Sequence, residues 1–424
     1  MARPYICLLA LAAMLLLGVA TISRSRGLRD KAHQSAPRIP SQFSQEERVA
    51  MKEALKGAIQ IPTVSFSPKE LNTTALAEFG EYIRKVFPTV FKTSFIRHEV
   101  VGEYSHLFTV HGSDPSLQPY MLLAHIDVVP APDEGWDVPP FSGLERNGFI
   151  YGRGTIDNKN SLMGILQSLE LLLIRNYIPR RSFFIALGHD EEVMGVNGAQ
   201  KISALLQARG VQLAFIVDEG SFIFDGFIPG LKNPFAIAGQ KLLMERNFVT
   251  NALVRTTTAL TMFNSGIKVT PPPPRFLPHI RSLQNQTPLV SSLKVLKLAK
   301  DIVADDRVQF HVLNAFDPSP ISPSDDQALG YQLLRQTIQS VFPEINIVVP
   351  GTCVVSTDSK HYLNLTTGIY LFNPLYLQPQ SFRTVHGINE RISVQAYERQ
   401  VKFIFEFIQN ADTDPKPVPH LHEL

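Results

Sequence analysis

The hydrophobic pattern of the first half of the chain alternates between two periods. Apolar residues that recur at helical spacing predict four helices, over Gln45–Ile59, Leu71–Val86, Ser161–Arg175 and Gly195–Arg209. Short, nearly continuous apolar runs predict three buried strands, over Pro119–Ile126, Ser182–Leu187 and Leu213–Val217. Strands that alternate with helices of this length are typical of a parallel sheet covered on both faces. We therefore expect an α/β fold built on a doubly wound, mostly parallel sheet.

The regular pattern stops between about Gly220 and Asp317. Four consecutive prolines, Pro271 to Pro274, lie in this interval. Proline lacks a backbone N–H and ends helices, so this stretch is predicted to be neither a central strand nor a helix interior. The pattern then returns with a helix, two strands and a final helix, over Asp325–Ser340, Ile345–Val349, Thr367–Phe372 and Ser393–Asn410.

These shifts predict the organisation of the whole chain. A core in two parts, residues 45–235 and 318–412, is interrupted by an irregular insert over 236–317 and followed by an exposed tail over 413–424. We see no internal repeat.

The N-terminus has the pattern of a signal peptide. Arg3 precedes an apolar run from Ile6 to Ala20, whose length suits the hydrophobic region of a secretory signal. A membrane-spanning helix needs about 20 apolar residues, and the polar segment Ser23–Arg26 closes this run too early. We expect a signal peptide over residues 1–20 and a secreted, extracellular protein, with a signal anchor as the alternative.

Composition limits the partners and the covalent framework. The 40 basic and 38 acidic residues give a formal net charge of +2, which does not favour nucleic acid as a partner. Since Cys7 lies in the signal, Cys353 remains alone and the secreted chain forms no internal disulfide. Three glycosylation triplets begin at Asn72, Asn285 and Asn364, so we expect a glycoprotein.

Acidic residues and a histidine follow three of the predicted strands. His125 and Asp127 follow the apolar run Met121–Ala124 of the first strand, and two acidic pairs, Glu191–Glu192 and Asp218–Glu219, follow the other two strands. Asp157 lies in a glycine-flanked turn before a helix. In doubly wound sheets the ligand crevice lies beyond the carboxyl ends of the strands, so these side chains are predicted to meet there.

A pair of divalent cations explains this set of residue types. Imidazole and carboxylate groups are usual zinc ligands, and a catalytic site leaves a position for water. Two metals that lie about 3.5–4 Å apart need a bridging carboxylate. Asp127 is placed to accept the second imidazole proton of His125 and to fix its tautomer. A spare acid must act as the general base, and Glu191 suits that role.

Several motifs together resemble the co-catalytic zinc aminoacylase and carboxypeptidase family. They are His125-Ile126-Asp127-Val128-Val129-Pro130, Gly135-Trp136 with Pro140-Phe141-Ser142-Gly143, Tyr151-Gly152-Arg153-Gly154-Thr155-Ile156-Asp157, Asp190-Glu191-Glu192, Val217-Asp218-Glu219-Gly220 and His386-Gly387-Ile388-Asn389-Glu390. The resemblance covers roughly residues 45–235 and 300–412. It implies that the α/β core is a zinc-peptidase core with a shortened or rebuilt lid domain.

The resemblance also implies a role for each site residue. Asp157 would bridge two zinc ions, with His125 and Asp218 completing one metal site. Glu192 and His386 would complete the other site. The catalytic residues would be Glu191, as the proton acceptor, and Asp127, as a supporting acid.

The function implied by the resemblance is reversible hydrolysis of N-fatty-acyl amino acids. The small-molecule partners would be the N-acyl amino acid, the fatty acid and the amino acid, and association with lipid or lipoprotein is a further expectation. The alternative in the same family is a dipeptidase or carboxypeptidase. The sequence does not indicate the acyl chain, the amino acid or the oligomeric state.

The insert departs from the family pattern. Family members carry a lid with a Gly-His-Ser/Thr motif and an arginine for the substrate carboxylate. Between Asp218 and His386 the histidines here are His279, His311 and His361, and none lies in such a motif. A third reading is therefore a metal-binding protein with impaired catalysis. Asp358 is left with two readings, a cap of the following turn or a residue of the site.

Overall fold

The computed structural model describes residues 38–227, 233–238, 257–264, 277–283, 292–305, 310, 320–351 and 356–413. The chain divides into two units, Met1–Pro40 and Ser41–Leu424. The expected signal peptide, the proline run, Cys353 and most of the tail lie outside the described residues. The helices and strands described lie in the second unit.

A six-stranded mixed sheet organises this unit. Its strand order is β15-β9-β5-β8-β4-β3, with bounds Ile369–Leu371, Ile216–Asp218, Tyr120–His125, Phe183–Gly188, Ser105–Val110 and Ile96–Val101. Neighbours from β15 to β8 pair in parallel, whereas β4 pairs antiparallel with both β8 and β3. The mostly parallel α/β sheet expected from the sequence is confirmed, with an antiparallel hairpin at one edge.

Helices cover both faces of this sheet. On one face, α6 (Ala199–Ala208) and the 3-10 turn η2 (Asp358–Tyr362) pack on Met121, Leu123 and Ile216. The other face carries α5 (Lys159–Ile174), which contacts β5 and α11 (Val394–Asn410). Successive strand residues point to opposite faces, so a strand covered on both sides must be apolar throughout. All six residues of β5 are buried accordingly.

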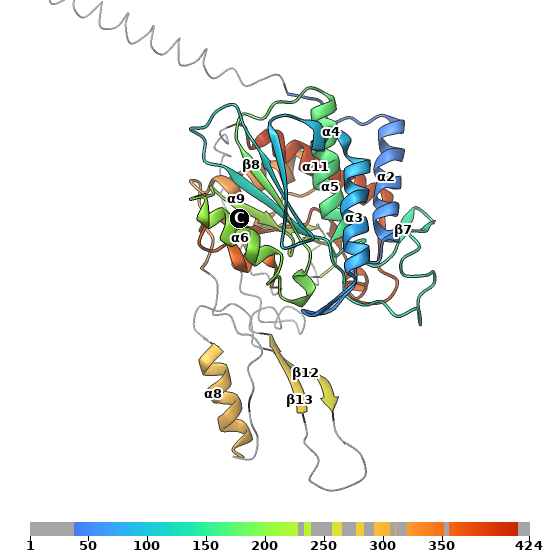
Figure 1. Ribbon diagram of the computed structural model, residues 1–424, viewed down its shortest axis with the longest axis vertical. Helices are drawn as coiled ribbons and strands as arrows, with labels where there is room; N and C mark the ends of the chain where they lie inside the picture. The colour runs from blue at the N-terminus through green and yellow to red at the C-terminus, as the bar shows by residue number, and fades with distance from the viewer. Residues whose placement is uncertain are drawn as a thin grey trace, which may run out of the picture. The chain divides into compact units, whose positions relative to one another are not determined.

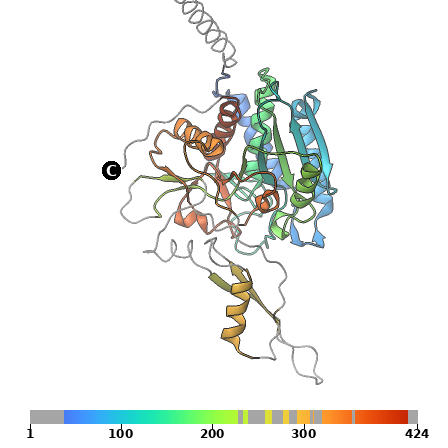
Figure 2. The ribbon, with the colours of Figure 1, turned by 90° about the vertical axis from the view of Figure 1, so that its left-hand side faces the viewer.

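Further helices extend the face covered by α5. The helices α2 (Gln45–Gln60), α3 (Thr73–Val86) and α4 (Pro88–Lys92) lie near α5 in Figure 1. On the other side of α11, Figure 2 shows α9 (Leu329–Val341) in orange beside it, and the two helices are in contact. The start of α2 is fixed by its own sequence. Ser44 and Glu47 form a reciprocal capping box there, in which the side chain of each accepts the backbone N–H of the other.

Smaller sheets surround the main one. A four-stranded sheet has the order β14-β11-β10-β16, with bounds Val348–Val349, Phe235–Ile237, Ile223–Phe224 and Tyr376–Leu377. A three-stranded sheet has the order β17-β7-β6, with bounds Arg391–Ser393, Phe149–Tyr151 and Glu145–Arg146. Short strands β1 (Ser65–Ser67) and β2 (Glu70–Leu71) pair with each other. Pairing of β17 with β7 joins segments that are far apart in the sequence.

The insert contains regular elements that the sequence pattern did not predict. Strands β12 (Thr257–Asn264) and β13 (Leu277–Leu283) form a two-stranded antiparallel sheet, and α8 covers Ser292–Val303. Proline at position 278 lies inside β13. This is compatible with the missing N–H because a strand of a two-stranded sheet has one edge that bonds to no neighbour.

The predicted helices and strands of the core are found within a few residues of their expected bounds. The largest differences are that α6 begins at Ala199 instead of Gly195, and α9 at Leu329 instead of Asp325. The hairpin of β3 and β4 was not predicted. Its outer strand β3 is half-exposed, so it lacks the continuous apolar run that identifies β5 and β8.

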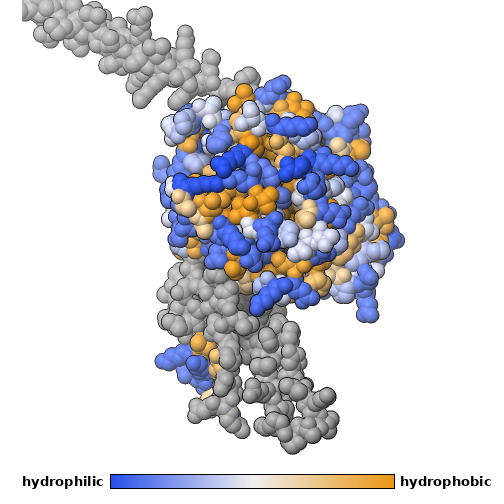
Figure 3. All heavy atoms as spheres, in the orientation of Figure 1, coloured by the Kyte–Doolittle hydropathy of each residue, from blue (hydrophilic) through white to orange (hydrophobic). Residues whose placement is uncertain are grey.

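The described surface is of the usual mixed kind. On the face shown in Figure 3, hydrophilic side chains surround several apolar patches. None of the helices in the described part of the chain has the length and hydrophobicity that a membrane crossing requires.

Candidate metal centre

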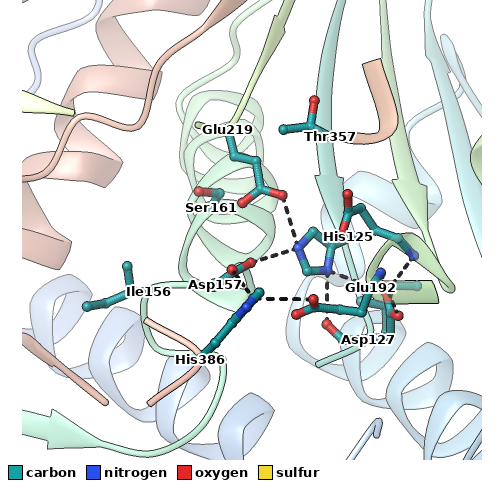
Figure 4. Close-up of polar contacts among 12 residues, drawn as sticks. His125, Asp127, Ile156, Asp157, Ser161, Glu192, Glu219, Thr357 and His386 are labelled. Atoms are coloured by element: carbon teal, nitrogen blue, oxygen red, sulfur yellow. Dashed lines mark hydrogen bonds and ion pairs between the residues drawn. The ribbon is translucent and has the colours of Figure 1, made fainter. Parts of the chain in front are cut away.

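The predicted site residues come from the carboxyl ends of three neighbouring strands and from two loops. His125 ends β5, Asp218 ends β9, and Glu191 and Glu192 begin the 3-10 turn η1 (Glu191–Val193) that follows β8. The other two segments are turns: Asp157 lies between β7 and α5, and His386 between α10 (Pro379–Phe382) and β17. Figure 4 shows five of these side chains converging: His125, Asp127, Asp157, Glu192 and His386.

Asp157 lies between the two histidines. Its Oδ1 is 2.9 Å from His125 Nε2, and its Oδ2 is 2.9 Å from His386 Nε2. One carboxylate therefore offers one oxygen to each imidazole, which is the arrangement that a bridging ligand requires. Burial acts to raise the pKa of Asp157, but the hydrogen bonds to His125 and His386 outweigh burial and lower it.

Glu192 faces the same histidine as Asp157 does. Its Oε2 is 3.3 Å from His386 Nε2, and its side chain is 5% exposed. The second oxygen, Oε1, is buried and has no hydrogen-bond partner among the described residues. A buried carboxylate oxygen without a donor is costly, and a cation would remove that cost. The residues present thus fit a bound metal.

Asp127 supports both sides of the site. Its backbone carbonyl is 2.9 Å from His125 Nδ1, nearer than its carboxylate Oδ1 at 3.4 Å. The carboxylate accepts hydrogen bonds from the backbone N–H groups of Glu191 and Glu192, at 3.0 and 3.2 Å, and from the Ser65 hydroxyl at 2.7 Å. Asp127 therefore orients the His125 ring through its carbonyl and holds the Glu191–Glu192 turn through its side chain.

Glu191 has the environment of a proton acceptor. Burial raises the pKa of its carboxyl well above the ordinary value, and the charges of Asp358 and Glu219 add to the rise, while His125 opposes it. These directions describe the chain without a cation. A base is most effective when its pKa lies near the working pH, so a carboxylate with a raised pKa is suited to accept and return a proton.

The two acidic residues at the end of β9, Asp218 and Glu219, contact different parts of the site. Asp218, the expected ligand, accepts hydrogen bonds from the Thr357 hydroxyl at 2.7 Å and from the Ser359 backbone at 3.0 Å. Its neighbour Glu219 places Oε1 3.0 Å from His125 Nε2. Sequence reasoning gave Glu219 no role. Its position beside Asp218 could have indicated a role in the site. The sequence does not show which of two adjacent carboxylates faces the histidine, because that depends on the direction of the backbone.

Glu390 fixes the two loops of the site to each other. It is fully buried, and its Oε1 accepts backbone N–H groups from Gly154 at 3.1 Å, Ile156 at 2.7 Å and Asp157 at 3.2 Å. Its Oε2 is 2.5 Å from Arg153 Nη1, and Arg153 Nη2 donates to the Gly387 carbonyl at 2.9 Å. The Asp157 loop and the His386 loop are held in register by this buried pair.

Two glycines allow the loop before Asp157 to take the backbone conformation in which its N–H groups reach the Glu390 carboxylate. Gly152 and Gly154 have φ angles of 152° and 95°, a range that favours glycine. A Cβ at position 152 would also lie 2.3 Å from a methyl carbon of Ile59.

Within the described residues, two sets of three side chains bring their donor atoms within 4.8 Å of one another. They are His125 with Asp157 and Glu192, and His125 with Glu191 and Glu219. The first set contains Asp157, whose other carboxylate oxygen lies 2.9 Å from His386 Nε2, so Asp157 is the residue placed to serve two neighbouring cations.

Other polar residues near the site have structural or unassigned roles. Thr357, not Asp358, caps η2, because the Thr357 hydroxyl accepts from the Ser359 backbone at 3.3 Å. Asp358 is buried, and neither of its carboxylate oxygens has a hydrogen-bond partner in the described part of the chain. The ring of His361 contacts the Met194 carbonyl at 2.8 Å, and that of His189 contacts the Ser105 hydroxyl at 2.6 Å.

Comparison with known proteins identifies the family of the chain. Residues 121–410 match peptidase family M20/M25/M40. The chain is similar to N-fatty-acyl-amino acid synthase/hydrolase PM20D1 of Bos taurus, at 66% identity over 507 aligned positions that cover 100% of both chains. The alignment has 507 positions and this chain 424 residues, so 83 positions have no counterpart here.

Solved structures share the fold. The M20 family metallo-carboxypeptidase Sso-CP2 from Sulfolobus solfataricus matches with a TM-score of 0.62 at 15% identity, over 87% of this chain and 100% of that one. Human carnosine dipeptidase 1 matches with a TM-score of 0.58 at 15% identity, over 87% and 98% of the two chains. At such low identity these matches show the fold alone, and they confirm the expected α/β architecture.

Proposed function

Because the chain belongs to peptidase family M20/M25/M40, we propose that it is a two-zinc amidohydrolase that cleaves N-fatty-acyl amino acids and, in reverse, forms them. The observation that carries the proposal is the placement of Asp157, with one oxygen 2.9 Å from each of two histidine Nε2 atoms. The substrate class is supported by the name of the bovine relative.

The donor set supports zinc as the metal. Two imidazoles and several carboxylates are usual zinc ligands, and a catalytic zinc site keeps a position for water. Bound there, two zinc ions would polarise the amide carbonyl and lower the pKa of a water molecule between them. We assign Asp157 as the bridge, His125 to one metal, and Glu192 with His386 to the other. The fifth ligand comes from the Asp218–Glu219 pair.

The protein groups supply the proton transfers and the alignment. Glu191 accepts the proton from the attacking water and returns it to the leaving amine, for which its raised pKa is suited. Asp127 keeps Glu191 in place by accepting its backbone N–H at 3.0 Å. In the reverse direction Glu191 takes a proton from the amino group of the amino acid.

We also propose that the protein is secreted and glycosylated. Residues 1–20 have the pattern of a secretory signal. Of the two glycosylation triplets within the described residues, Asn364 is exposed and donates to the Gln207 side chain at 3.3 Å, whereas the half-buried Asn72 side chain caps α3 and donates to the Pro62 carbonyl at 2.9 Å. Asn364 is therefore the better acceptor for a glycan.

A second candidate function is metal binding with impaired catalysis. The 83 alignment positions without a counterpart support it, and so does the lack of a Gly-His-Ser/Thr motif between Asp218 and His386. We place the shortened segment in the insert over 236–317. Lipid or lipoprotein binding would then be the remaining activity.

Hydrolysis assays distinguish these functions. The zinc-loaded full chain is incubated with an N-palmitoyl amino acid or with a plain dipeptide, and the released amine is quantified by chromatography. We expect the wild type to release the amino acid from the palmitoyl substrate, and Glu191→Gln to release it at a rate lower by about 100-fold or more. Faster cleavage of the dipeptide would favour the dipeptidase alternative. No cleavage of either substrate by a zinc-loaded chain would favour the impaired variant.

A further inference from the structure

We propose that Glu219, and not its neighbour Asp218, supplies the fifth carboxylate ligand of the metal pair, and that Asp218 is a positioning residue. The inference rests on the two-metal site proposed above and assigns one of its ligands. It reverses the assignment that motif position alone suggests.

Asp218 has both carboxylate oxygens occupied by protein donors. Its Oδ1 accepts the Glu219 backbone N–H at 2.9 Å. Its Oδ2 accepts the Thr357 hydroxyl at 2.7 Å and the Ser359 backbone N–H at 3.0 Å. Asp218 is 3% exposed, so these donors replace water. A metal bond would compete with these hydrogen bonds, whose loss would leave buried donors unpaired.

Glu219 points to the atom that a metal would bind. Its Oε1 is 3.0 Å from His125 Nε2, and Asp157 Oδ1 is 2.9 Å from the same nitrogen. Figure 4 shows Glu219 and Asp157 approaching the ring of His125 together.

The tautomer of His125 makes this contact informative. Its Nδ1 faces the Asp127 carbonyl at 2.9 Å, and a carbonyl can only accept, so Nδ1 carries the hydrogen. In the neutral ring Nε2 then presents a lone pair toward two carboxylate oxygens. Three acceptors that converge on one point repel one another unless a proton or a metal ion lies among them; a proton on Nε2 makes the hydrogen bond to Asp157 in the metal-free chain, and a bound metal would take its place. That arrangement fits metal ligands.

Strand geometry explains why one member of the pair is selected. Asp218 is the last residue of β9, and successive side chains of an extended segment point to opposite sides. With Asp218 turned toward the Thr357–Ser359 segment, Glu219 is turned toward His125. Asp218 thereby fixes the end of β9 to the start of η2. Because Glu219 directly follows β9, this contact also fixes the direction of the Glu219 side chain.

Two matched variants test the assignment. Glu219→Gln and Asp218→Asn each remove one charge and keep the shape of the side chain. The full chain is equilibrated at a fixed, buffered zinc concentration and its zinc content is measured by elemental analysis, with circular dichroism to confirm folding. Cobalt substitution adds a visible spectrum that reports the ligands directly.

We expect about two zinc equivalents in the wild type and in Asp218→Asn, and about one in Glu219→Gln. The cobalt spectrum should change in Glu219→Gln and stay as in the wild type in Asp218→Asn. Glu219→Asp, which keeps a carboxylate, should recover the second equivalent at higher zinc concentration. If Asp218→Asn fails to fold, Thr357→Val replaces it as the variant that disturbs Asp218 but should keep both metals.

The inference is overturned if Glu219→Gln keeps two equivalents, or if Asp218→Asn or Thr357→Val loses one while folded. Asp157→Asn separates this failure from that of the underlying site. If Asp157→Asn loses zinc while Glu219→Gln does not, the two-metal site stands and the ligand assignment is wrong. If the wild type binds no zinc, the two-metal site itself is wrong.

Discussion

Replacing Glu390 by glutamine should destabilise the chain far more than replacing an exposed carboxylate. Glu390 is fully buried, and its Oε2 is 2.5 Å from the guanidinium of Arg153, which is itself 2% exposed. Burial raises the pKa of the Glu390 carboxyl, and the Arg153 charge and the backbone N–H of Ile156 oppose that shift. Glutamine keeps an acceptor for the backbone donors but leaves the arginine charge buried and unpaired.

The burial of the Glu390–Arg153 pair sets the expected loss of stability in Glu390→Gln. Breaking a buried ion pair by removing one partner costs about 3–5 kcal/mol, because the remaining charge stays uncompensated. The total stability of a folded protein is about 5–15 kcal/mol, so this is a large part of it. The control is Glu53→Gln: Glu53 is 55% exposed and pairs with Lys56 on the surface of α2. Its loss should cost less than about 1 kcal/mol.

The free energy of unfolding is measured by urea denaturation of the zinc-free variants. The double variant Arg153→Leu with Glu390→Leu should be less destabilised than Glu390→Gln, since neither charge is left behind. Zinc affinity of Glu390→Gln should fall about 10–100-fold, because Asp157 and His386 lose their common support. If Glu390→Gln were no less stable than Glu53→Gln, the pair would not hold the two loops together.

Three further results are expected. Glu191→Gln should keep its zinc while turnover falls about 100-fold or more; unchanged turnover would transfer the base role to Asp127. In the zinc-free chain, hydrogen bonds to Asp157 and Glu192 raise the pKa of His386 from 6.5 to about 10, so its stabilising contribution is complete below pH 6.5 and is lost as the pH rises toward 10. Urea denaturation across that range should show it, and a His386→Gln chain with the same pH dependence would exclude this cause. With matched zinc content, hydrolysis of one fatty-acyl substrate should be at least about 100-fold slower than by the bovine relative, because the sequence between Asp218 and His386 has no Gly-His-Ser/Thr motif to supply an oxyanion donor; equal rates would mean that another group supplies it.

The sequence predicts the position of the site well because that position follows from strand ends. Apolar runs identify β5, β8 and β9, and the parallel arrangement brings the residues after them to one edge of the sheet. The sequence alone therefore predicts that His125 and Glu192 lie close together.

What the sequence does not reveal depends on contacts between distant segments. Glu390 contacts Arg153 across 237 positions, and Asp218 contacts Thr357 across 139, so no local pattern indicates either pair. For the same reason the choice between Asp218 and Glu219 requires the direction of each side chain. The half-exposed strand β3 was not predicted because its sequence is not a continuous apolar run.

Zinc content of the purified full chain and of Asp157→Ala tests the central claim most directly. We predict about two zinc equivalents in the wild type and none retained in Asp157→Ala, because one carboxylate serves both metals. The variant should also lose the stabilisation that zinc gives the wild type on thermal unfolding. A folded wild-type chain without zinc, or a folded Asp157→Ala chain that keeps two equivalents, would contradict the account.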